Sequence, residues 1–142
     1  MKRATTVLLA LLIGISCTQT AGRRGLPAEV EATVNQITEN IAAERYEEIY
    51  KQAADLWRND STLEESTATF RTLRAKLGQA QTRNLHTAIE QDNASGPLKG
   101  RVYIVNYQTR FEKDQGMETF TLVERESEWR LARYFVSSTA LQ

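Results

Sequence analysis

The sequence has very little of the residues that build covalent, redox or metal sites. Its 142 residues include one cysteine, Cys17, and one histidine, His86. A single cysteine excludes an internal disulfide, a CxxC redox motif and a cysteine-rich zinc site, and a single histidine excludes a site with two imidazole ligands. We therefore expect no metal ion and no cofactor.

The sequence also lacks an excess of charge of either sign. Eighteen Lys and Arg residues balance 18 Asp and Glu residues, so the formal net charge is zero. Proteins that bind nucleic acid need a basic surface for the phosphates, so this balance argues against a nucleic-acid partner. Apolar residues make up 41% of the chain and charged residues 25%, as in an ordinary globular domain, and the length leaves room for one such domain.

The N-terminal apolar run is too short to cross a bilayer. It covers residues 7–15, whereas a membrane-spanning helix needs about 20 residues. Lys2 and Arg3 precede the run and small residues follow it, which is the arrangement of a secretory signal peptide. We expect the signal peptide to cover residues 1–16.

The end of this run and the two residues after it resemble the bacterial lipobox, in Ile13-Gly14-Ile15-Ser16-Cys17. The resemblance implies that Cys17 receives a lipid such as palmitate-bearing diacylglycerol, and that residues 17–26 form a tether to the membrane. Several acyl chains give a stable anchor, whereas one chain binds only marginally. Thr18 follows the cysteine, which implies an outer-membrane protein facing the periplasm if the host has two membranes. The alternative is an ordinary secretory signal that is cut at the same bond.

Apolar residues recur at helical spacing in the first half of the rest of the chain. Thr62 and Glu65 fit a capping box, and Gly78 is a typical helix terminator. The pattern leaves open whether the first two helices are separate or form one long helix. The expected helices cover residues 27–42, 45–58 and 63–77.

Apolar and polar residues then alternate, which is typical of strands. Hairpin turns are expected near residues 92–97, 113–116 and 126–128. The expected strands cover residues 85–90, 103–111, 117–125 and 129–137. Helices followed by an antiparallel meander predict one α+β domain over residues 27–142, with the helices packed on a curved four-stranded sheet.

Several segments of the C-terminal half carry a resemblance to a known fold: Val105-x-Tyr107, Phe120-Thr121-Leu122-Val123, Glu128-Trp129-Arg130-Leu131 and Tyr134. They resemble the last hairpins of the cone-shaped nuclear transport factor 2-like (cystatin-like) fold. The middle of the chain, in Arg74-x-x-Leu77-Gly78 and Arg83, is similar to uncharacterised exported bacterial domains of this type. The resemblance implies that the helices cross the concave side of the sheet, and that the cone between them is an open pocket or a filled core.

Five aromatic residues and one arginine are candidates for lining such a pocket. The alternative for the aromatic residues is that they fill the core. Arg133 would point into the cone if it faces the same way as Trp129 and Leu131, and would then suit an anionic ligand with help from Arg83; otherwise it is exposed. The candidates are Tyr46, Tyr50, Trp57, Tyr103, Tyr107 and Arg133.

No proton-transfer group is evident in the expected cone. Glu112, Glu118 and Glu124 are expected at or near strand ends, in solvent, and His86 is expected to face outward. We therefore expect no catalytic residue, and a membrane-tethered binding or accessory domain; the alternative is a small isomerase, dehydratase or hydrolase.

An apolar strip is expected on the outer face of the sheet. Ile104, Met117 and Val123 share the outward phase of their strands. Exposed apolar strips often become interfaces, so the strip predicts a homodimer or an envelope protein partner that binds through the sheet.

Overall fold

The computed structural model describes residues 25–142. The expected signal peptide, the expected lipid acceptor Cys17 and the expected tether up to residue 24 lie outside these residues. Across 25–142, no helix has both the length and the apolar character needed to span a bilayer.

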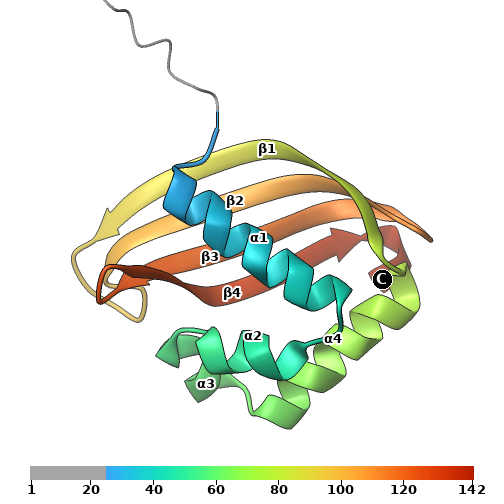
Figure 1. Cartoon of the computed structure of the whole chain (residues 1–142), viewed down its shortest axis with the longest axis horizontal. Coiled ribbons are helices and arrows are strands. Elements are labelled where there is room, and N and C mark those ends of the chain that lie inside the picture. The colour runs from blue at the N-terminus through green and yellow to red at the C-terminus, as the bar shows by residue number, and fades with distance from the viewer. Residues whose placement is uncertain (1–24) are drawn as a thin grey trace, which may run out of the picture.

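Four helices precede a four-stranded antiparallel sheet with the strand order β1-β2-β3-β4. Helix α1 runs across one face of the curved sheet, and α2, α3 and α4 lie on the side of β4 (Figure 1). This confirms the α+β prediction. The elements are α1 (Ala28–Ala42), α2 (Tyr46–Gln52), α3 (Asp55–Asp60), α4 (Leu63–Leu77), β1 (Ala80–Asn93), β2 (Gly100–Phe111), β3 (Gln115–Arg125), β4 (Glu128–Ser138) and a short 3-10 helix, η1 (Thr139–Leu141).

Local signals set both ends of α4, as predicted. The Thr62 side chain accepts a hydrogen bond from the Glu65 backbone, and the Glu65 side chain accepts one from the Thr62 backbone, which completes the capping box. At the other end Gly78 has a φ of 77°, a conformation that side chains with a Cβ rarely adopt.

The predicted helix over residues 45–58 is wrong, because the chain breaks into α2 and α3 at Ala53 and Ala54. Both alanines are extended and buried. The Ala54 backbone N–H donates to the Leu131 carbonyl of β4 at 2.9 Å. The break therefore provides a hydrogen bond to one carbonyl on the free edge of β4. Helical periodicity in the sequence cannot predict this partner.

The face of the sheet that packs on α1 is called the inner face here. Val30, Val34 and Ile37 of α1 share one core with Val105 of β2 and Phe120 of β3. These side chains are at most 7% exposed. The spacing of the apolar residues along α1 and the alternation along β2 were thus correct guides to this core.

A bulge in β4 reverses the phase of that strand. Leu131 pairs with Leu122, but Arg133 pairs with Thr121, so Ala132 is an extra residue. Leu131 and Tyr134 therefore both reach the inner face, although strict alternation would separate them.

The opposite, outer face is only partly open. Val123 is fully buried in a cluster with Ala54 and Ala132, so its predicted exposure is wrong. Ile104 and Met117 are half-buried. The large exposed apolar side chains here are Phe135 of β4, which is 64% exposed, and Ile89 of β1, which lies opposite Ile104 and is 47% exposed.

Candidate functional site

A polar cluster on the inner face takes one side chain from each strand: Arg83 from β1, Thr109 from β2, Glu118 from β3 and Tyr134 from β4. Glu118 is 0% exposed and lies at the centre. Arg83 donates from Nε to Oε2 at 2.6 Å and from Nη2 to Oε1 at 3.2 Å. The Thr109 hydroxyl donates to Oε2 at 2.5 Å, and the Tyr134 hydroxyl donates to Oε1 at 2.6 Å.

Strand register brings these four residues together. Arg83 lies directly opposite Thr109, and Glu118 lies opposite Tyr107, the residue two before Thr109. Tyr134 lies opposite Phe120, two residues after Glu118. Residues two apart share a face of the sheet, so all four side chains converge on the inner face.

Each carboxylate oxygen of Glu118 accepts two hydrogen bonds, so the group is a saturated acceptor. Two of the four hydrogen bonds come from Arg83, which also supplies a positive charge, and one each comes from Thr109 and Tyr134. Burial, followed by the charge of Glu118, raises the pKa of Tyr134 well above its ordinary value. Tyr134 therefore stays protonated and acts as a donor to Glu118.

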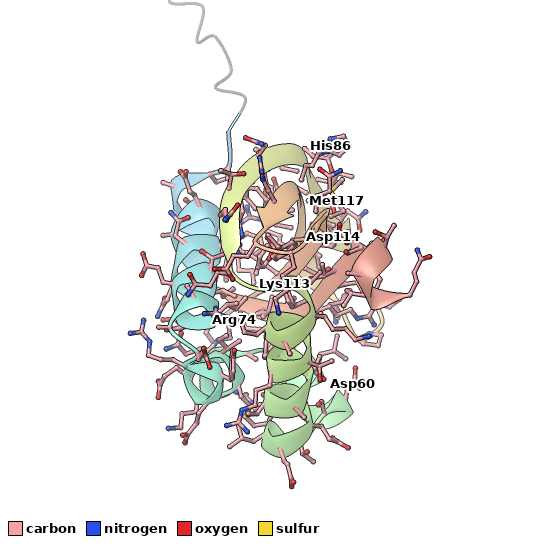
Figure 2. The ribbon with its side chains drawn as sticks, turned by 90° about the vertical axis from the view of Figure 1, so that its right-hand side faces the viewer. Asp60, Arg74, His86, Lys113, Asp114 and Met117 are labelled. Atoms are coloured by element: carbon pink, nitrogen blue, oxygen red, sulfur yellow. The ribbon has the colours of Figure 1, made fainter. Side chains whose placement is uncertain are left out.

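A small cavity borders this cluster on the side of α4. Its volume is about 40 Å³, and its walls include Glu118, Arg83, Phe70 and Leu77. Arg74 of α4, which also lines it, extends toward the end of α1 (Figure 2). A water molecule needs roughly 10–15 Å³ measured in this way, so the cavity suits a few waters and no larger molecule.

The expectation that Glu118 lies near a strand end in solvent is wrong. Glu118 is in the body of β3 and shares its phase with the buried Phe120 and Leu122. This shared phase could have indicated that Glu118 is buried. Burial of a carboxylate cannot be predicted with it, however, until the partner on another strand is known. Glu112 is exposed at the end of β2, and Glu124 is partly exposed near the end of β3.

The aromatic candidates lie against other side chains. Tyr46 and Trp57 both stack on Phe70 of α4, at centroid distances of 5.2 and 5.9 Å. Trp57 also donates its indole N–H to the hydroxyl of Ser66. These contacts favour the core interpretation over an open aromatic pocket. Tyr103 packs edge-on against Trp129, Tyr107 packs edge-on against Phe120, and Tyr50 is half-buried.

Tyr46 carries the one buried side-chain polar atom that lacks a hydrogen-bond partner within residues 25–142. Burial is the main cause that raises the pKa of its hydroxyl, and the nearby charge of Glu44 adds to it. The ring of Tyr46 stacks on Phe70, and its hydroxyl is not among the donors to Glu118.

Arg133 and His86 do not join the polar cluster. Because of the bulge at Ala132, Arg133 is exposed on the outer face, so the anion site that it was to form with Arg83 is not assembled. His86 is exposed at the bend of β1 (Figure 2). Across the described residues, no group of three or more His, Cys, Asp and Glu side chains could hold a metal ion.

Comparison with known proteins identifies a family without naming an activity. No protein with a curated function matches the chain. Residues 33–134 match the family described as "Protein of unknown function (DUF4019)", and this stretch runs from α1 to β4 and contains the whole polar cluster. Since the match covers more than half of the sequence, the chain belongs to the DUF4019 family.

Proposed function

We propose that this protein is an exported, lipid-anchored domain that acts by binding. In this proposal the buried side chains of the inner face stabilise the fold and form the scaffold of the domain. The observation that carries the proposal is the saturation of Glu118, the carboxylate buried on the inner face. We further propose that the domain is a member of the nuclear transport factor 2-like folds. The curved sheet with α1 across one face supports this assignment (Figure 1).

Saturation of Glu118 disfavours a role in proton transfer. A general base needs a free lone pair within hydrogen-bond reach of the substrate proton, and both oxygens here already accept two donors. The adjoining cavity of about 40 Å³ is also far below the roughly 300–1,000 Å³ of small-molecule sites. A substrate would have to displace both Arg83 and the stacked side chains around Phe70.

The rival function is a small isomerase, dehydratase or hydrolase that uses Glu118. A buried carboxylate beside a cavity, with the Tyr134 hydroxyl at 2.6 Å, favours this candidate. The two functions differ in what Glu118 does for stability. Replacing a carboxylate that supports the fold lowers stability, whereas replacing a catalytic carboxylate commonly raises it.

The proposed anchor depends on the thiol of Cys17 and on nothing in the folded domain. Two lines of reasoning support it: the lipobox resemblance and the lack of any other cysteine to pair with. If the host has two membranes, we place the protein on the outer membrane, facing the periplasm.

Replacing Cys17 by serine tests the anchor directly. We expect the Cys17→Ser protein to leave the membrane fraction and to lose the mass of the acyl chains, while Thr18→Ser, which keeps the thiol, stays membrane-bound. Fractionation and intact-mass measurement give both readouts. An unmodified Cys17 in the native protein would refute the anchor.

A further inference from the structure

We propose that a polar groove beside α1 binds a neutral saccharide. The groove lies between α1, α2 and the β3–β4 turn, and we call it the amide groove after its glutamines. The N-terminal end of α1 lies on the side of the β3–β4 turn (Figure 1). The residues that carry the argument are Thr33, Gln36, Gln52, Ser127, Trp129 and Arg130.

The amide groove has the size of a ligand site. Its volume is about 520 Å³, within the roughly 300–1,000 Å³ of small-molecule sites and well above the 40 Å³ beside Glu118. A second hollow of about 60 Å³ shares lining residues with it, Gln36 and Gln52 among them, and reaches the buried side chains of Ile49 and Leu131. The groove thus adjoins the core.

Two amides cross the groove and present a matched pair of hydrogen-bonding atoms. Gln36 of α1 donates from Nε2 to Oε1 of Gln52 of α2 at 3.0 Å. Within residues 25–142, Oε1 of Gln36 and Nε2 of Gln52 have no hydrogen-bond partner. One free acceptor beside one free donor is what a sugar hydroxyl requires, because a hydroxyl both donates and accepts.

Hydroxyl groups extend this surface on both walls. Thr33 lies one helical turn before Gln36, and its hydroxyl donates to the Glu29 carbonyl at 2.9 Å, which leaves its lone pairs as acceptors. Ser127 lies on the opposite wall, in the β3–β4 turn. Apart from the small Ala32, the groove has no apolar side chain except the largely buried Trp129 at its base. A peptide would need apolar anchor pockets that this lining does not provide.

The formal charges of the groove lining sum to zero, and its cations are paired, which argues against an anionic ligand. Two carboxylates, Glu29 and Glu128, face two cations, Lys51 and Arg130. The cations are already neutralised locally, since Arg130 pairs with Glu128 at 2.9 Å and Lys51 pairs with Glu47 at 3.0 Å. An anionic ligand would find no unpaired cation here.

The β3–β4 turn is held in a costly conformation at the edge of this groove. Glu126 and Ser127 have φ values of 53° and 65°, where hairpin turns normally use Asn or Gly. Such strain persists where a side chain is retained for another purpose. Ser127 lines the groove and Glu126 does not, so substitutions at these two strained positions separate a contact with the ligand from relief of strain.

The saccharide site deepens the proposed function and rests on its claim that the domain acts by binding. The test uses the full-length protein purified from membranes in detergent, with a tetramer of N-acetylglucosamine and a tetramer of glucose as probes. Calorimetry measures affinity for the native protein and for the variants Gln52→Ala, Ser127→Gly and Glu126→Gly.

Saturable binding of either sugar supports the site if Gln52→Ala weakens it about threefold to tenfold, as expected for one lost hydrogen bond. The two glycine variants form a matched pair. Both relieve strain and should raise the melting temperature, but only Ser127→Gly should weaken binding.

Absence of sugar binding up to the solubility limit would overturn the site. So would binding that is unaffected by Gln52→Ala and Ser127→Gly, or tighter binding of an unglycosylated peptide. If Cys17→Ser still releases the protein from membranes in that case, the anchored domain stands and only the saccharide assignment fails.

Discussion

Replacing Glu118 by glutamine keeps the shape of the side chain but removes its charge and one of its acceptor oxygens. The amide must place its NH₂ group where one oxygen now accepts, either against Arg83 Nε and Thr109 or against Arg83 Nη2 and Tyr134. The hydroxyls can rotate to accept, but the guanidinium cannot, because it carries donors alone. At least one charge-assisted bond is therefore lost.

The expected loss of stability is large because Glu118 is fully buried and the Arg83 side chain is only 22% exposed. Each hydrogen bond to a charged group contributes about 1.5–3 kcal/mol. Breaking a buried ion pair costs about 3–5 kcal/mol, since the remaining charge is left without a partner. We expect Glu118→Gln to lower the free energy of unfolding by about 3 kcal/mol, which corresponds to a fall of roughly 10 °C in Tm for a domain of this size.

Urea unfolding followed by the fluorescence of Trp57 and Trp129 measures this loss. The matched control is Glu124→Gln on the same strand, which also removes a carboxylate paired with an arginine. Arg101 and Glu124 are 47% and 26% exposed, so this variant should lose less than about 1 kcal/mol. A Glu118→Gln protein as stable as the native one, or more stable, would refute the scaffold role and favour a catalytic carboxylate.

Three further predictions concern other parts of the domain. Hydrogen bonds, chiefly from Ser138, lower the pKa of Asp114 from 3.8 to about 2, so its stabilisation is complete above pH 3.8 and is lost as the pH falls toward 2; the unfolding free energies of the native protein and Asp114→Asn should converge over that range, and a constant difference would contradict this. Gly78→Ala should cost roughly 1–3 kcal/mol in urea unfolding, because φ is 77° and the new Cβ would lie 2.7 Å from Cβ of Glu112; unchanged stability would contradict the strain. If the outer face forms a homodimer, light scattering should show dimers at high concentration that Phe135→Ser converts to monomers, and only monomers of the native protein would dismiss that interface.

Part of this fold could be predicted because its causes are local. The capping box of Thr62 and Glu65 and the stop at Gly78 depend on residues within one turn of each other, and both ends of α4 were predicted from them. The alternation over residues 103–111 likewise predicted a strand, and β2 covers Gly100–Phe111. Backbone geometry alone links these patterns to structure.

Tertiary structure decided the features that bear on function, because each depends on a partner distant in sequence. The break at Ala54 depends on a carbonyl of β4, and the exposure of Arg133 depends on a bulge defined only by pairing with β3. The role of Glu118 depends on Arg83, which lies 35 residues earlier in the chain. A lone carboxylate in the sequence is expected to remain in water, since burying an unpaired charge costs several kcal/mol. Only the assembled sheet supplies the donors that make its burial possible.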